Sequence, residues 1–224
     1  MSELNDFDLL LEATRKGFQA LFKEHKENFY YCTLILSEGA TPFISALSDE
    51  TLKEIVKKNG DKYSSETLKW SYADSPYCGY GFREYFQVLD KVFYGRMKKI
   101  SSDEKYGQEI DYWLSLMEKV MKTLDKEKIF GVGKYRRDMI INAEIMPPDE
   151  TNAERASRLN TKITYQKWYS DNFCETKEQI SDDFIKELSK MSRGEIALAF
   201  KNMTTDEVET AIKYVKKLNQ ENPV

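Results

Sequence analysis

Only a few short segments of this chain have the composition or alternation of β-strands, and helical patterns separate most of them. Aromatic and β-branched residues mark the first segment, whereas apolar and polar residues alternate in the last. The predicted strands are 28–36, 41–47, 67–70 and 138–146. Because few of them are joined in regular strand–helix–strand units, the sequence predicts an α+β fold with a small, mostly antiparallel sheet flanked by helices.

The last predicted strand is expected to be half-buried. Successive side chains of a strand point to opposite faces, so its apolar and polar residues would separate. One face would carry Met139, Ile141, Ala143 and Ile145, and the other would carry Asn142 and Glu144.

Helices are predicted wherever apolar residues recur at steps of three and four positions, which is the spacing of one helix face. Ser48 before one such pattern, and the pair Thr151 and Glu154 before another, are typical residues of helix starts. The predicted helices of the α+β part span 7–25, 48–59, 82–97, 110–124 and 151–159.

Beyond about residue 161 only amphipathic helical patterns are found, over 176–191, 192–200 and 204–218. We therefore expect an α+β main domain over residues 1–165 and an all-helical C-terminal extension over residues 166–224. Apolar helix faces are usually buried within their own chain, so packing of the extension on the main domain is favoured over dimerisation. The oligomeric state is left open.

The balance of charge argues against a dedicated nucleic-acid-binding protein. The chain has 38 acidic and 34 basic residues, whereas nucleic-acid-binding domains carry a basic excess on one face. No apolar run approaches the roughly 18 residues that span a bilayer, and the acidic N-terminus does not resemble a signal peptide. Three widely spaced cysteines fit a reducing compartment. These features predict a soluble cytoplasmic protein with no nucleic-acid or membrane partner.

The sequence lacks the familiar catalytic and cofactor-binding patterns. His25 is the single histidine and falls at the end of the first predicted helix, where a packed or capping role is commoner than a catalytic one. Gly131 and Gly133 lack the third glycine of a dinucleotide-binding loop and follow a helix, so they predict a turn. We therefore expect no cofactor and no metal site, and a binding role is favoured over enzymatic activity.

The aromatic loop that starts at Trp70 is the first of two places where a function is expected. Trp70, Tyr72 and Tyr77 would supply rigid contact area, and Asp74 would supply a hydrogen-bond acceptor beside Pro76. This combination suits recognition of a ligand or partner. In the alternative, structural interpretation, Trp70 and Tyr77 pack beneath the loop while Asp74 stabilises a local turn.

The last predicted helix of the main domain is the second place. Arg155 and Arg158 are three residues apart and share a helix face, so together they could grip a carboxylate or phosphate. Asp149 and Thr151 are better explained as cap residues than as ligands. The alternative role for both arginines is ion pairing with nearby Asp and Glu side chains.

Several segments of unusual composition follow one another in the order and spacing of a known family. They are Phe29-Tyr-Tyr-Cys-Thr-Leu34, Leu68-Lys-Trp-Ser-Tyr-Ala-Asp-Ser-Pro-Tyr-Cys78, Leu124-Asp125 before Ile129-Phe-Gly-Val-Gly133, and Met146-Pro-Pro-Asp149 through Arg158-Leu-Asn160. Over about residues 5–165 the chain resembles the bacterial family called "domain of unknown function 4303". Family members often have proline after the Leu-Asn pair, where this chain has Thr161.

The resemblance implies an α+β fold and a cytoplasmic bacterial protein with no established activity. Members of the family are sometimes associated with immunity proteins of contact-dependent toxin systems. Recurring family positions would correspond here to Trp70, Arg137 or Arg136, Asp149, Arg158 and Asn160.

Two classes of function follow from these observations. The leading hypothesis is a non-catalytic binding protein, of an immunity or regulatory type, whose partner is another protein. The alternative is a small-ligand-binding domain or an enzyme that acts on an anionic group. It would use Arg137, Arg155 or Arg158 as a clamp and Asp74 or Asp149 as an acid or base. The alternative requires that these residues converge on one concave pocket.

Overall fold

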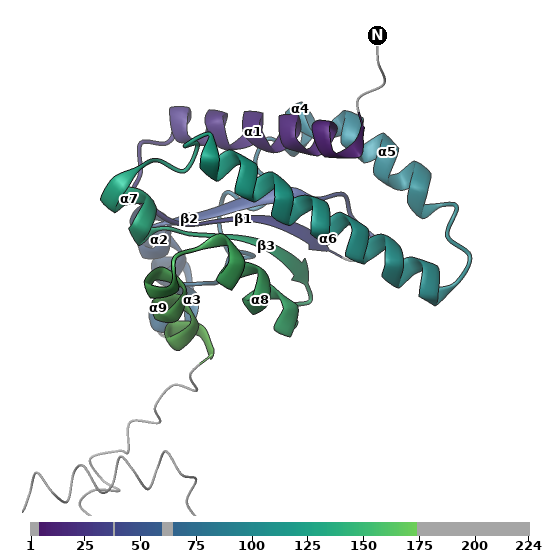
Figure 1. The fold of residues 1–224 in the computed structure, drawn as a ribbon. Coiled ribbons are helices and arrows are strands. Elements are labelled where there is room, and N and C mark those ends of the chain that lie inside the picture. Colours follow the sequence, from purple (N-terminus) through teal and green to yellow (C-terminus); the bar gives the residue numbers. More distant parts are fainter. Residues whose placement is uncertain (1–4, 38, 60–64, 174–224) are drawn as a thin grey trace, which may run out of the picture. The chain divides into compact units, whose positions relative to one another are not determined.

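The computed structural model describes residues 5–37, 39–59 and 65–173. In this part of the chain, β1 (Phe29–Ser37), β2 (Phe43–Ser48) and β3 (Ile140–Met146) form one three-stranded sheet in the order β2-β1-β3 (Figure 1). β1 pairs with β2 in antiparallel and with β3 in parallel orientation. The predicted α+β class is confirmed, and the sheet is mixed where mostly antiparallel pairing was expected.

The orientation of β3 follows from the connection that leads to it. A short turn joins β1 to β2, which suffices for antiparallel pairing, whereas a parallel strand needs a long crossover. Residues 49–139 provide that crossover and carry several helices. β3 then pairs with β1 from Tyr31 opposite Ile140 to Ser37 opposite Met146.

Helices lie on both sides of the sheet (Figure 1). One side is covered by α1 (Asp6–Glu24), α4 (Phe82–Tyr85), α5 (Gln87–Met97) and α6 (Asp103–Lys126). The other side holds α2 (Asp49–Asn59), α3 (Ser65–Leu68), α8 (Glu150–Leu159) and α9 (Lys162–Phe173), and the short α7 (Gly133–Asp138) leads from α6 into β3. Of the helices described, none is long and apolar enough to cross a membrane.

The larger hydrophobic core lies between the sheet and α1, α5 and α6. Its largest fully buried side chains are Phe18, Phe86, Phe93, Trp113 and Phe130. Trp113 of α6 meets Phe93 of α5 edge to face, with ring centroids 5.3 Å apart. α6 also contacts β3 and so forms one wall of the cleft described below.

A smaller core lies on the other face of the sheet, and its centre is polar. Its apolar members are Tyr31, Leu47, Ile55, Leu68, Ile140, Ala156 and Trp168. Asn142 and Glu144 of β3 point to this side and expose only 0% and 2% of their surface. The predicted alternation of β3 is therefore confirmed, but the expectation of a half-buried strand is wrong, because α8 and α9 pack against the polar side as well.

Two predicted elements differ from the structure. Residues 67–70 form no strand, because α3 ends at Leu68 and a turn follows. The outer edge of β2, where such a strand could pair, is already bonded to residues of the next loop. The predicted helix over 82–97 is interrupted at Phe86, whose fully buried ring lies between α4 and α5 in the chain.

Three helices, α3, α7 and α9, were not predicted. The predicted turn at Gly131 and Gly133 is present, with φ angles of 84° and 61°, and α7 begins directly at Gly133. α9 lacks a clear apolar stripe, which removes the signal that identifies a helix in a sequence. At the start of α8 the N-cap is Asp149, so the expected cap role of this residue is confirmed, whereas Thr151 lies inside the helix.

The described structure continues through α9, past the boundary expected at residue 165, and α9 contacts β3 and α8. The helices predicted over 176–191, 192–200 and 204–218 lie outside the described residues. The helical extension and its packing therefore stay predictions.

Candidate functional site

The outer edge of β3 is closed by amide side chains of α8 and its C-cap. Asn152 accepts from the backbone N–H of Ile145 at 2.8 Å and donates to its carbonyl at 3.1 Å. Asn160 makes the same pair of bonds with Ile141, at 3.0 and 2.7 Å. Each side-chain amide thus takes the place of a neighbouring strand, and the edge is protected from pairing with another chain.

The opposite edge of the sheet, at β2, is closed by the aromatic loop. The Ser75 hydroxyl donates to the carbonyl of Ala46, and the backbone N–H of Gly79 donates to the carbonyl of Ile44 at 2.9 Å. The two segments singled out in the sequence therefore lie at opposite edges of the sheet, with all three strands between them. They do not converge on one pocket as the anion-clamp hypothesis required.

Trp70 and Tyr72 pack against the smaller core. The Trp70 ring meets those of Tyr30 and Tyr31 edge to face, with centroids 5.4 and 5.7 Å apart. Tyr72 is half-buried, and its backbone carbonyl accepts from the Ser45 hydroxyl at 2.8 Å. These contacts correspond to the structural interpretation of the aromatic loop.

Tyr77 and Asp74 also make local contacts. Tyr77 is 8% exposed, its hydroxyl donates to Glu27, and its oxygen lies 3.0 Å from Nδ1 of His25. His25 is the C-cap of α1, as expected from the sequence. Asp74 is exposed and accepts from the Ser71 hydroxyl at 2.5 Å, which stabilises the turn.

At the paired arginines of α7, a part-buried network forms around Arg136 instead of Arg137. The Arg136 guanidinium forms an ion pair with Asp125 and donates to the carbonyls of Met139, at 2.9 Å, and Leu159, at 3.1 Å. Arg137 is exposed, and only its backbone carbonyl makes a described hydrogen bond. Of the two residues that match the family position, Arg136 is the one with a structural role.

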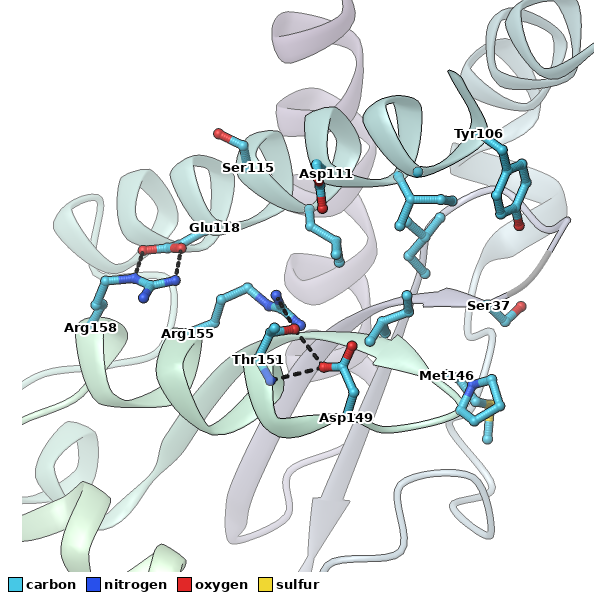
Figure 2. Close-up of a pocket in the computed structure, with 16 residues that line it drawn as sticks. Ser37, Tyr106, Asp111, Ser115, Glu118, Met146, Asp149, Thr151, Arg155 and Arg158 are labelled. Carbon is cyan, nitrogen blue, oxygen red and sulfur yellow. Dashed lines mark hydrogen bonds and ion pairs between the residues drawn. The ribbon is translucent and has the colours of Figure 1, made fainter. Parts of the chain in front are cut away.

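A cleft of about 600 Å³ lies between α6, α8 and the C-terminal end of β3 (Figure 2). Its lining includes the predicted site residues Asp149, Arg155 and Arg158. The apolar part of the lining consists mainly of Leu36, Ile110, Leu114, Ile145, Met146 and Pro147, and the polar part includes Asp111, Glu118 and Thr151. The structure thus brings together the predicted residues of one segment and leaves Trp70, Tyr72, Asp74, Tyr77, Arg137 and Asn160 outside the cleft.

Arg155 is the central polar residue of the cleft. Its side chain is almost fully buried, with 5% of the residue exposed. The guanidinium donates to the carbonyl of Ala143 at 2.5 Å, to the Thr151 hydroxyl at 2.8 Å and to the Asn152 amide oxygen at 2.6 Å. Burial disfavours the charged form and lowers the pKa of Arg155, while the nearby carboxylate of Asp149 opposes this effect.

The positive charge of Arg155 has no direct counter-charge, since no carboxylate of the described residues forms an ion pair with it. A guanidinium has five N–H donors, and three are used in the bonds to Ala143, Thr151 and Asn152. The two remaining N–H groups therefore have no acceptor within the described structure, and the guanidinium lines the cleft.

The other charged groups of the cleft are mostly paired. Arg158 donates twice to Glu118 of α6, both at 2.9 Å, and this hydrogen bonding raises the pKa of Arg158 (Figure 2). Asp149 accepts from the backbone N–H of Thr151 at 2.9 Å and from its hydroxyl at 2.5 Å. The ion-pair interpretation of the arginines therefore holds for Arg158 but not for Arg155.

Three acidic residues in or near the cleft were not predicted as site residues from the sequence. Asp111 and Glu118 are seven residues apart and so share a face of α6, but such residues usually mark a solvated surface. Glu144 was placed on the polar face of β3, and its complete burial depends on helices distant in sequence. Burial raises the pKa of Glu144 to about 8, although Arg155 opposes the shift.

A second hollow, of about 390 Å³, is lined by His25, Lys26, Glu27, Lys128 and Tyr135 among others. It contains none of the predicted site residues. Across the residues that the structure describes, no three His, Cys, Asp or Glu side chains are arranged to hold a metal ion.

A family model described as "Domain of unknown function (DUF4303)" matches residues 10–161. The chain belongs to the DUF4303 family. The matched region of this DUF4303 protein contains all three strands, both closed sheet edges and the whole lining of the cleft. No curated protein and no solved structure matches this chain. Any function of the DUF4303 fold must therefore be argued from the geometry of its own residues.

Proposed function

We propose that this DUF4303 protein is a non-catalytic binding protein, and that the cleft between α6 and α8 binds a ligand with an apolar body and an anionic group. The single observation that carries the proposal is Arg155, a buried cation at the cleft wall without an ion-pair partner. A non-catalytic binding protein is also the function expected from the sequence. The proposed binding surface is the cleft and no longer the aromatic loop.

A buried charge without a counter-charge is energetically costly, so a site of this kind favours a ligand that supplies the missing charge. The two unused N–H groups of Arg155 can donate to a carboxylate or phosphate oxygen, and such charge-assisted bonds contribute about 1.5–3 kcal/mol each. Three bonds to the protein already hold the guanidinium in place. Little conformational entropy is therefore lost when an anion binds.

The rest of the cleft suits an apolar ligand body. Leu36, Ile110, Leu114 and Ile145 come from three different elements and line one continuous hollow. Its volume of about 600 Å³ is within the range of small-molecule sites. The anionic group can belong to a small molecule or to an exposed chain end of a partner protein, because both present the same carboxylate.

The proposal is tested with caproate and benzoate as anionic probes and n-hexanol as the uncharged probe, with binding followed by NMR titration of the full chain. Gly107→Trp places an indole at the cleft, and the Cβ added at Gly107 meets no atom within 4 Å. Gly95→Trp is the matched control, because Gly95 is an exposed glycine of α5 with the same free space and lies outside the cleft lining.

We expect both carboxylates to bind the wild-type chain and the Gly95→Trp variant, and to bind Gly107→Trp at least about tenfold more weakly, which is 1.4 kcal/mol. Equal binding of caproate and n-hexanol would contradict the role of Arg155, and unchanged binding to Gly107→Trp would exclude the cleft. A second arm compares a short apolar peptide that has a free C-terminal carboxylate with its amide. Selective binding of the free peptide would show that a protein chain end is accepted.

A further inference from the structure

The charges of the cleft do not balance within the protein. Its lining has the two guanidiniums of Arg155 and Arg158 and the three carboxylates of Asp111, Glu118 and Asp149. Arg158 and Glu118 neutralise each other through two hydrogen bonds of 2.9 Å. Asp149 is held by the first turn of α8, where its carboxylate caps the helix. Asp111 and Arg155 are left as the two charged residues of the lining that neither a described ion pair nor a helix N-terminus neutralises, and Asp149 acts on Arg155 without forming an ion pair with it.

Asp111 is available for a ligand. It is an exposed residue of α6, and it makes neither an ion pair nor a hydrogen bond with any described residue. Figure 2 shows its carboxylate directed into the cleft from α6, while Arg155 enters from α8 on the opposite wall. An anionic and a cationic group of the protein therefore face the same hollow from two sides.

We propose that the ligand of this cleft is a zwitterion, with its anionic group at Arg155, an ammonium group at Asp111 and an apolar carbon chain on the lining between them. This inference rests on the proposed binding function and adds the second charge of the ligand. The chemical class is an amino acid or ω-amino acid with an aliphatic chain.

Ligands with a single charge fit the cleft less well. An anion without an ammonium group would place an apolar chain against the Asp111 carboxylate and remove part of its hydration without replacement. A cation without an anionic group would bring a positive charge into a hollow that already contains the unpaired guanidinium of Arg155. A zwitterion provides an opposite charge for both residues.

The test uses three probes with the same carbon chain: caproate, norleucine and ε-aminocaproate. Norleucine and ε-aminocaproate are isomers that differ only in the distance between the ammonium group and the carboxylate. Binding of each probe is measured by NMR titration of the wild-type chain and of Asp111→Asn. Glu104→Gln is the control, because Glu104 is also an exposed acidic residue of α6 but does not line the cleft.

We expect at least one amino acid isomer to bind about fivefold more tightly than caproate, which corresponds to an ion pair at a partly hydrated site. Asp111→Asn should abolish this preference and should bind caproate at least as tightly as the wild type, because the carboxylate that disfavours its apolar chain is gone, and Glu104→Gln should alter neither. The preferred isomer reports the spacing of the two charges, and preference for either supports the proposal.

If caproate binds but neither isomer is preferred, or if Asp111→Asn keeps the preference, the zwitterion inference is overturned while the proposed binding function stands. Failure of all three probes to bind would refute both. The Asp111 side chain is exposed and makes no described hydrogen bond or ion pair, so Asp111→Asn removes no such interaction of the fold.

Discussion

Glu144 is the most informative residue for a test of the buried polar layer. Its carboxyl group lies beneath α8 with 2% of the residue exposed. Oε1 accepts from the Tyr31 hydroxyl and from the Asn142 amide at 2.9 Å, whereas Oε2 has no hydrogen-bond partner among the described residues. Glu144→Gln keeps the shape and the acceptor atom of this side chain and removes its ionisation.

The expected effect follows from the difference in pKa between the folded and unfolded states. Burial raises the pKa of Glu144 from 4.5 to about 8. Between these values the unfolded chain releases a proton that the folded chain keeps, so the free energy of unfolding falls as the pH rises. The full shift corresponds to about 5 kcal/mol, of which about 3–4 kcal/mol falls between pH 5 and pH 8.

The assay is urea-induced unfolding of the full chain at several pH values and constant ionic strength. The free energy of unfolding of the wild type is subtracted from that of Glu144→Gln at each pH, which cancels the titration of all other groups. We expect this difference to move in favour of Gln by about 3–4 kcal/mol from pH 5 to pH 8. At the acidic end the variant should be the less stable protein, because its amide leaves unpaired N–H groups where Oε2 lies.

Parallel pH profiles for the wild type and Glu144→Gln would refute this reasoning, because they would show that Glu144 binds no extra proton in the folded state. Glu84→Gln is the control, since Glu84 is exposed and its side chain makes no described hydrogen bond or ion pair. Its profile should follow that of the wild type.

Four further substitutions test the packing of the cleft and of the fold that supports it, each by the free energy of unfolding from chemical denaturation. Gly107→Ala should stabilise the protein by about 0.5–1 kcal/mol, because an added methyl group in α6 meets no atom within 4 Å and removes a flexible helical glycine. Gly17→Ala should instead destabilise it, because the new Cβ would lie 2.9 Å from an isoleucine side chain of β2. Asn160→Ala should cost about 2–4 kcal/mol, since it leaves both backbone groups of Ile141 without their partner. Arg158→Ala should cost less than about 1 kcal/mol, because this ion pair is half-exposed; a larger loss would show that it stabilises the fold.

Local patterns identified most of the elements that surround the cleft. The apolar spacing of α6 and the alternation of β3 were visible in the sequence, because side-chain direction follows directly from helix and strand geometry. The cap role of Asp149 was visible for the same reason, since capping depends on neighbouring residues only. α9 was missed because its apolar residues do not form a stripe.

The candidate site depended on information that no local pattern contains. Asp149, Arg155 and Arg158 line one cleft, as their places on one short helix suggested. Trp70, with the rest of the aromatic loop, and Arg137 do not join them. The sheet order β2-β1-β3 places the aromatic loop and α8 at opposite edges, and that order is set by pairing between strands that are far apart in sequence.

Sequence patterns therefore decided which face of each helix and strand is apolar and where most helices begin. The tertiary structure decided which residues contact the polar face of each helix and strand. Arg155 and Arg158 are three positions apart on the same helix. Arg158 nevertheless forms an ion pair with a carboxylate of α6, whereas Arg155 donates to a backbone carbonyl of β3 and lines the cleft. The reason is physical: the direction of a side chain is a property of its own backbone, whereas its burial and its partners depend on the segments that the fold packs against it.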